Sequence, residues 1–219
     1  MAKHGAIMDK YDPEKRVGMI VDEWGTWYQV EPGTNPGFLY QQNSLRDAVS
    51  AGLHLNIFNQ HCARVKMANI AQTVNVLQAM ILTDGPRMTL TPTYHVFEMY
   101  KVHHDATLLP IDLQCRDYRF ADEAMTALSV SASRNAAGTV HISLCNLDAE
   151  KEVELSCQLQ GMRGRKVSGR VLTAPVMTAH NTFEGPDAVE PEEFDAVELQ
   201  GSRLTMTVPS KSVVVLAVE

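Results

Sequence analysis

The spacing of hydrophobic residues changes once along this chain, near residue 105, and that change limits the folds the chain can adopt. Before it, apolar runs alternate with stretches in which apolar residues recur every three or four positions. After it, short stretches alternate apolar and polar residues with a period of two. The first pattern is typical of strands and helices in turn, and the second of antiparallel strands. The sequence therefore predicts an α/β part over residues 1–104 and an all-β part over residues 105–219.

The first part is predicted to contain two strands and two helices. Residues 17–21 form a nearly continuous apolar run, which is typical of a parallel strand covered on both faces. Residues 64–72 alternate well enough to form a second strand. Apolar residues within 45–53 and 96–100 have helical spacing, and the pair Thr91-Pro92 suits the N-cap and first turn of the second helix. Strand, helix, strand, helix indicates an α/β barrel or a doubly wound sheet.

The second part is predicted to be an antiparallel β-sandwich. Its alternating stretches are separated by turns rich in Gly, Pro, Asn and Asp, and no helical spacing occurs among them. No long linker divides the two parts, so we expect them to pack directly against each other. The alternating stretches begin near residues 128, 140, 153, 204 and 213.

Charge and hydropathy argue against two classes of partner. The net charge of -7 provides no cationic face for nucleic acid or an anionic membrane. The one basic cluster, Arg163, Arg165, Lys166 and Arg170, is interpreted as a solvated loop. No apolar stretch approaches the ~18 residues of a membrane span. The first residues contain no apolar signal core, so a cytoplasmic location is favoured.

No group of side chains predicts a metal or another cofactor. The four cysteines lack CxxC spacing and are interpreted as buried free thiols. His103 and His104 are adjacent at a predicted helix end and would point in different directions. The acidic stretch 190–195 lacks the spacing of a calcium loop and is interpreted as solvated. His180 and Glu184 are expected to serve domain packing or a turn.

Two carboxylates and an indole follow the first predicted strand, at Asp22, Glu23 and Trp24. Active sites of α/β barrels are built at the C-terminal ends of the strands. A charge at the end of a buried strand is costly unless something there uses it. A carboxylate bonded to loop amides or to an arginine would fit the same position, so position alone names no reaction.

A family resemblance adds to this reading. Residues 17–28 resemble the nucleophile strand of the α-L-arabinofuranosidases of glycoside hydrolase family fifty-one. Further stretches resemble the same family in the same order, at residues 56–62, 65–76, 91–100, 180–184 and 212–216. The resemblance implies the C-terminal portion of a (β/α)8 barrel, with its last two strands, followed by a jelly-roll-like β-sandwich.

The resemblance also implies roles for particular residues. Glu23 would be the nucleophile of a retaining hydrolase that releases terminal α-L-arabinofuranosyl residues from arabinan, arabinoxylan or their oligosaccharides. Gln72 would hydrogen-bond the sugar, unless it is a capping amide in its loop. Trp27 would line the entrance beside the leaving group, unless it packs under the loop. No cofactor is implied, and full-length members of the family are expected to form homo-oligomers.

Neighbouring residues are given supporting roles. Asp22 and Trp24 are expected to orient the strand end. Asn69 and Asn75 lie near the site in sequence and are assigned no more than a supporting role.

One part of the catalytic machinery is missing from the sequence. A retaining glycosidase uses two carboxylates about 5–5.5 Å apart. In the family the proton donor follows Gly-Asn, and this chain contains no Gly-Asn-Glu. Its α/β part has about a hundred residues, where a full barrel takes roughly 250. We therefore expect a truncated chain that is inactive alone.

Two other interpretations remain open. One is a non-catalytic carbohydrate-binding sandwich, which would need solvent-facing aromatics, whereas both tryptophans lie at the nucleophile strand. The other is an assembly fragment in which Glu23 is structural.

Overall fold

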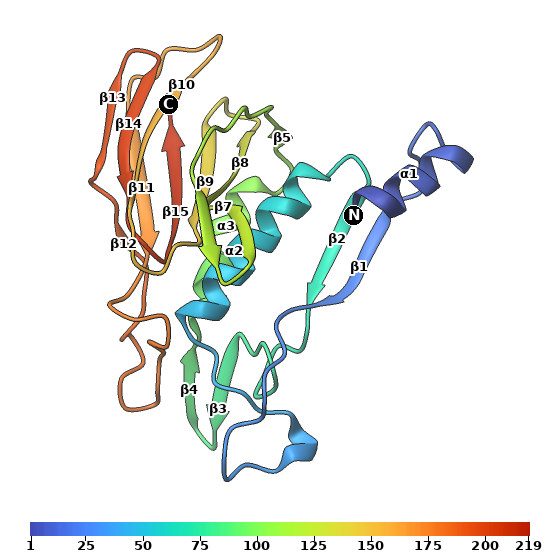
Figure 1. The fold of residues 1–219 in the computed structure, drawn as a ribbon, viewed down its shortest axis with the longest axis vertical. Coiled ribbons are helices and arrows are strands. Elements are labelled where there is room, and N and C mark those ends of the chain that lie inside the picture. The colour runs from blue at the N-terminus through green and yellow to red at the C-terminus, as the bar shows by residue number, and fades with distance from the viewer.

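The computed structural model describes residues 1–219 and has three regions side by side (Figure 1). Two stacked β-sheets lie on one side, helices α2 and α3 lie in the middle, and a pair of parallel strands with helix α1 extends on the other side. None of the helices has the length and apolar content that crossing a bilayer requires.

The first two strands form a parallel pair. Strand β1 (Met19–Trp24) and strand β2 (Val65–Ile70) run side by side and are joined through helix α2 (Leu45–Gln60). The prediction of two parallel strands joined by a helix is confirmed. The expected cover on both faces is wrong for this chain, because Ile20 is 50% exposed and Met67 is 53% exposed. The pair stands alone as a two-stranded sheet, and Ile20 and Met67 meet solvent.

Helix α1 (Ala2–Tyr11) was not predicted, and it has no buried residue because its apolar residues form no continuous stripe. Arg64, at the start of β2, attaches it to the parallel pair. Its guanidinium donates to Asp12 Oδ2 at 2.6 Å and to the Val17 carbonyl at 2.8 Å, and it also bonds Asp9. The hydrogen bond from Arg64 is the main reason that the pKa of Asp9 lies below its usual range. The pKa of Asp12 is also lowered, mainly by the hydrogen bond from the Val17 backbone amide and then by that from Arg64.

Helices α2 and α3 (Pro92–Tyr100) share one apolar core with the larger sheet of the sandwich. The two predicted parts therefore pack directly together, as expected. Thr91 is the N-cap of α3, but its hydroxyl donates to the Ala79 carbonyl at 2.8 Å instead of capping the helix. The short helix η2 (Lys101–His103) extends α3. Members of the shared core include Leu45, Ala48, Val49, Val96, Met99, Tyr100, Cys145, Val213 and Val215.

The second part is the predicted antiparallel sandwich. A six-stranded sheet in the order β12-β11-β15-β9-β8-β5 faces a three-stranded sheet in the order β10-β14-β13. Apolar residues of both sheets enclose the second core, among them Leu144, Leu204 and Leu216. The larger sheet comprises β5 (Thr107–Leu108), β8 (Leu128–Arg134), β9 (Val140–Asn146), β11 (Val167–Leu172), β12 (Glu192–Glu193) and β15 (Ser212–Val218). The smaller comprises β10 (Val153–Gln158), β13 (Val197–Gln200) and β14 (Arg203–Val208).

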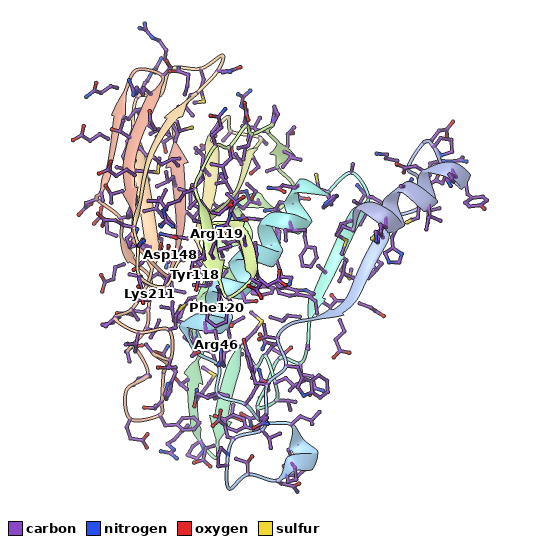
Figure 2. All side chains as sticks on the ribbon, in the orientation of Figure 1. Arg46, Tyr118, Arg119, Phe120, Asp148 and Lys211 are labelled. Carbon is purple, nitrogen blue, oxygen red and sulfur yellow. The ribbon has the colours of Figure 1, made fainter.

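Two hairpins and a short helix complete the fold, and none was predicted. The hairpin of β3 (Ile81–Asp84) and β4 (Arg87–Leu90) lies between β2 and α3 in the chain. Helix η1 (Pro36–Phe38) lies in the loop that leaves β1. The hairpin of β6 (Asp117–Phe120) and β7 (Glu123–Thr126) pairs with no other strand and ends in the exposed ring of Phe120 (Figure 2).

Two details of the sequence interpretation need correction. Arg170 is not in a loop, because it lies in β11 and forms an ion pair with Glu98 of α3. All four cysteines are free, but only Cys145 is fully buried, and Cys62 is exposed at the end of α2. The alternation of apolar and polar residues around Cys115 and Cys157 did not predict how deeply they are buried, because both lie at the margin of the sandwich core.

A polar seam joins α2 to the sandwich. The outward face of β8 and β9 carries serines, and Asn56 of α2 is fully buried against them. Its Oδ1 accepts hydrogen bonds from Ser131 Oγ at 2.9 Å and Ser143 Oγ at 2.8 Å, and its Nδ2 lies 3.3 Å from Ser129 Oγ. Buried polar groups matched in this way favour one arrangement of the helix on the sheet.

Candidate active site

The predicted nucleophile, Glu23, and the predicted sugar-binding amide, Gln72, lie at the same end of the parallel pair, where the C-termini of both strands are. Trp24 is opposite Ile70, and the Ala71 amide donates to the Trp24 carbonyl at 2.8 Å. Glu23 is the residue before Trp24, and Gln72 is the residue after Ala71. Both are exposed at the C-terminal ends of their strands. Parallel pairing thus brings together two segments that are about fifty residues apart in sequence.

Trp24 fixes the end of β1 against the helices. Its ring stacks on His54 with centroids 5.3 Å apart and on Phe97 at 5.9 Å, and it meets the edge of Phe58 at 5.2 Å. The pairing register shifts between Val21 and Trp24, and Glu23 lies in this irregular stretch with its side chain exposed. This packing agrees with the orienting role expected for Trp24.

Trp27 and Asp22 have different environments. Trp27 is 66% exposed, so the alternative of an indole packed under the loop does not describe this chain. Asp22 Oδ1 lies 3.5 Å from Asn69 Nδ2, a long hydrogen bond that links β1 to β2 next to Glu23. The roles expected for Asp22 and Asn69 at the site stay predictions.

The segment after β2 has an unusual backbone. Gln72 has a φ of 51° and Asn75 a φ of 58°, both in the left-handed region. Such conformations cost on the order of 1 kcal/mol and concentrate at functional sites. Asn75 is braced by Thr83, whose amide donates to Asn75 Oδ1 at 2.8 Å. The Gln72 side chain makes no hydrogen bond within the chain, which argues against the alternative of a capping amide.

A buried polar cluster lies directly under the loop that follows Glu23, and the sequence interpretation missed it. Gly25 has a φ of 148°, and a Cβ there would lie 2.5 Å from Gln78 Cγ, so only glycine fits. Gln78 Nε2 donates to the Thr26 carbonyl at 2.8 Å and to its hydroxyl at 2.5 Å. The Thr26 hydroxyl donates to Asp47 at 2.9 Å, and Gln41 Nε2 donates to the Thr26 carbonyl at 3.1 Å. No motif marks these residues, because they meet only in the folded chain.

His180 and Glu184 lie in the segment between β11 and β12, where His180 Nδ1 lies 2.9 Å from the Thr178 carbonyl within a local turn and Glu184 contacts the β3–β4 hairpin. Arg87 of β4 donates to Glu184 Oε1 at 3.0 Å, and its guanidinium carbon lies 4.6 Å above the Phe183 ring. The buried amide of Asn181 also donates to the Leu90 carbonyl at 2.9 Å. The sandwich segment is thereby attached to the β3–β4 hairpin, as the packing interpretation expected.

His103 is a partly buried polar group on the seam between the helices and the sandwich. Its Nδ1 lies 2.7 Å from Ser133 Oγ, and its ring packs against Tyr100 and His141. Burial, with smaller contributions from His141 and His104, lowers the pKa of His103 to about 4. His103 is therefore interpreted as a neutral side chain that packs at the interface between the helices and the sandwich.

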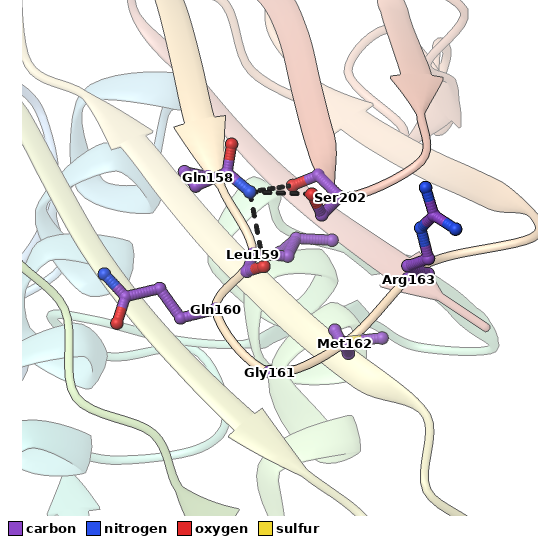
Figure 3. A pocket seen from close by; sticks show the side chains of 7 residues that line it. All are labelled: Gln158, Leu159, Gln160, Gly161, Met162, Arg163 and Ser202. Atoms are coloured by element: carbon purple, nitrogen blue, oxygen red, sulfur yellow. Dashed lines mark hydrogen bonds between the residues drawn. The ribbon is translucent and has the colours of Figure 1, made fainter.

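The surface hollows lie elsewhere. The turn between β10 and β11 frames an open hollow of about 550 Å³, in which Gln158 bonds Ser202 (Figure 3). A second hollow of about 320 Å³ lies between α1 and the N-terminal ends of β1 and β2. Neither of these two hollows includes Glu23.

Comparison with known proteins gives a consistent result. Residues 22–212 match the family described as the alpha-L-arabinofuranosidase C-terminal domain. An intracellular exo-alpha-L-arabinofuranosidase of Bacteroides ovatus is 48% identical over 220 aligned residues, which cover 100% of this chain and 43% of the relative. An intracellular exo-alpha-(1->5)-L-arabinofuranosidase of Streptomyces lividans is 24% identical and is covered over 31% of its length.

Solved structures agree on the fold. The crystal structure of the GH51 arabinofuranosidase from Xanthomonas axonopodis pv. citri superposes with a TM-score of 0.97 at 54% identity, over 100% of this chain and 44% of that one. The arabinose complex of the Thermotoga maritima α-L-arabinofuranosidase gives a TM-score of 0.81 at 24% identity, covering 96% of this chain and 45% of the other, a likeness of fold alone. The chain thus spans less than half the length of these proteins.

Proposed function

This chain belongs to the α-L-arabinofuranosidase C-terminal domain family, and on that premise we propose that it supplies the nucleophile side of a retaining α-L-arabinofuranosidase site. The activity would release terminal α-L-arabinofuranosyl residues from arabinan, arabinoxylan or their oligosaccharides. The observation that carries the proposal is the exposure of Glu23 and Gln72 at one edge of two parallel strands. In barrel enzymes this edge is where substrate binds.

Each residue has a chemical task in the proposal. The Glu23 carboxylate attacks the anomeric carbon while the leaving alcohol takes a proton from a second carboxylic acid. Water then attacks the same carbon, releases arabinose with net retention and restores the carboxylate. Gln72 offers an amide to the sugar hydroxyls, and the exposed indole of Trp27 offers an apolar surface beside the leaving group.

The second carboxylic acid is proposed to lie outside these 219 residues. The family places it after Gly-Asn, and the sequence contains no Gly-Asn-Glu. General acid assistance contributes about 10²–10⁴-fold to rate, and the earlier barrel strands that would hold the sugar are also absent from the fold. We therefore expect the chain alone to have little or no activity.

A chimera tests this proposal. The 219 residues would replace the matching C-terminal segment of the Xanthomonas axonopodis enzyme, which the chain covers over 44% of its length. We expect the chimera, but not the chain alone, to hydrolyse an aryl α-L-arabinofuranoside. Glu23→Ala should lower kcat by at least about a thousandfold, because the nucleophile is lost. Added azide, which can attack the anomeric carbon in its place, should restore turnover.

The matched control is Glu31→Gln. Glu31 is a carboxylate of the same loop whose Oε1 accepts the Gln42 amide at 2.8 Å. It should change kcat much less than Glu23→Ala does. Turnover that survives Glu23→Ala without azide would refute the assignment of the nucleophile.

Location and assembly complete the proposal. The relatives from Bacteroides ovatus and Streptomyces lividans are named intracellular, which supports a cytoplasmic location for this protein. Homo-oligomer formation by the full-length protein is expected from the family resemblance. Sedimentation of the chimera would test it, and a monomer would contradict it.

A further inference from the structure

We propose that Thr26 is a positioning residue for the Glu23 carboxylate, and that it acts through hydrogen bonds to Gln78 and Asp47. This inference rests on the proposed function and adds a residue to it. Thr26 follows Glu23 by three residues, at the point where the chain turns away from the parallel pair. Its position therefore decides the direction in which the end of β1 leaves the sheet.

Every hydrogen-bonding group of Thr26 beyond its amide is occupied by a buried partner. The carbonyl accepts from Gln78 Nε2 at 2.8 Å and from Gln41 Nε2 at 3.1 Å. The hydroxyl accepts from Gln78 and donates to Asp47 Oδ1 at 2.9 Å. Gln41 and Gln78 are each 2% exposed, so their amides have no water to bond instead. Breaking one link leaves a buried donor or acceptor unpaired, which is the costly outcome.

Asp47 anchors the cluster to a rigid element. It is fully buried at the third position of α2, and its Oδ2 accepts from the Ser44 amide at 2.8 Å in a capping box. A carboxylate at a helix N-terminus is favoured by the helix dipole and by the free amides there. Thr26 is therefore attached to the start of α2, whose position is set by its core with the sandwich.

Gln78 brings the second segment into the same cluster. It lies six residues after Gln72 in the segment that leaves β2, and its side chain fills the space over Gly25. One buried side chain thus connects the segments that follow Glu23 and Gln72. The connection holds the two exposed residues at a constant relative position, and catalysis is sensitive to such positions at the level of about 1 Å.

An isosteric pair of variants in the chimera tests the role of the hydroxyl. Thr26→Val keeps the shape and the methyl group but removes the hydroxyl. Thr26→Ser keeps the hydroxyl and removes the methyl group. We expect Thr26→Val to lower kcat by about 10- to 100-fold with a much smaller change in KM. Thr26→Ser should stay within about threefold of the parent, because the hydrogen bonds are retained.

A space-filling role predicts the reverse order. If Thr26→Val keeps the parent kcat, or Thr26→Ser falls as far as Thr26→Val, the proposal is overturned. Gln78→Met supplies a second test, with Gln60→Met as its matched control. Gln60 Nε2 also donates to a backbone carbonyl, that of Val130 at 2.7 Å, but it lies at the other end of α2. Only Gln78→Met should lower kcat by about tenfold or more.

A measurement without turnover separates this inference from the proposed function. Hydrogen exchange over residues 22–30 would be followed in the 219-residue chain. Thr26→Val should speed the exchange of this peptide, and Thr26→Ser should not. Equal exchange in the two variants overturns the positioning role even in an inactive protein. Accelerated exchange in Thr26→Val together with full activity of Glu23→Ala would refute the nucleophile and leave the hydrogen-bonded link standing.

Discussion

The sandwich and the parallel strand pair bury their apolar residues to very different extents. In the sandwich, the two sheets enclose their core, and Leu204 and Leu216 have no exposed surface. In the parallel pair, Ile20 of β1 and Met67 of β2 are each about half exposed, at 50% and 53%. The difference teaches that a strand is stabilised by what covers its faces rather than by its composition.

Each region pairs its polar groups in its own way. The outer face of the large sheet carries serines that α2 satisfies through Asn56. The end of the parallel pair instead exposes Glu23 and Gln72 and keeps its buried polar groups, such as Gln78, one layer below. The sandwich therefore acts as the support, and the strand edge is where chemistry is proposed.

Removing a core side chain of the sandwich should give the largest effect. Leu204→Ala creates a cavity between the two sheets, and we expect a loss of about 2–5 kcal/mol in the free energy of unfolding. Urea unfolding followed by circular dichroism would measure it. A loss below 1 kcal/mol would mean that the sandwich core is not the main source of stability, and the contrast between the regions would fail.

Acid should weaken the seam between the helices and the sandwich. The pKa of His103 is about 4 in the folded chain, below the ordinary value of about 6.5, because the ring is buried. The unfolded chain binds more protons between these values, so stability is full above pH 6.5 and falls as the pH approaches 4. Between pH 6.5 and pH 4, proton binding at His103 should lower the free energy of unfolding by an amount on the order of 3 kcal/mol.

Thermal unfolding across this pH range, compared between the parent and His103→Gln, isolates that contribution. Burial also lowers the pKa of His141 and His95, so some pH dependence should remain in the variant. An unchanged slope in His103→Gln would show that this ring does not control the acid response.

Removing an apolar side chain from the parallel pair should give the smallest effect. Ile20→Ala deletes a residue that is half exposed, so we expect a loss below about 1 kcal/mol in the chain itself. The same substitution in the chimera should cost more, because added barrel strands would cover this face. If Ile20→Ala lowers the free energy of unfolding equally in the chain and in the chimera, barrel strands do not cover this face of β1.

Much of the fold followed from local pattern. The change of period near residue 105 predicted the sandwich, and the apolar run before Asp22 predicted β1. The placement of the domain boundary between residues 104 and 105 stays a prediction, because α2, α3 and the large sheet share one core. Helix α1 was missed because it is held by the charge of Arg64 and not by an apolar stripe.

The sequence by itself placed the carboxylate of Glu23 at the end of the first predicted strand, and its resemblance to the α-L-arabinofuranosidases supplied Gln72 and Trp27 as candidate residues. Only the tertiary structure decided that Glu23 and Gln72 share one edge, and that Gln78 and Asp47 meet under Thr26. The reason is physical. Periodicity records which face of an element is apolar, whereas a buried hydrogen bond between distant segments depends on one geometry that appears only after the elements have packed.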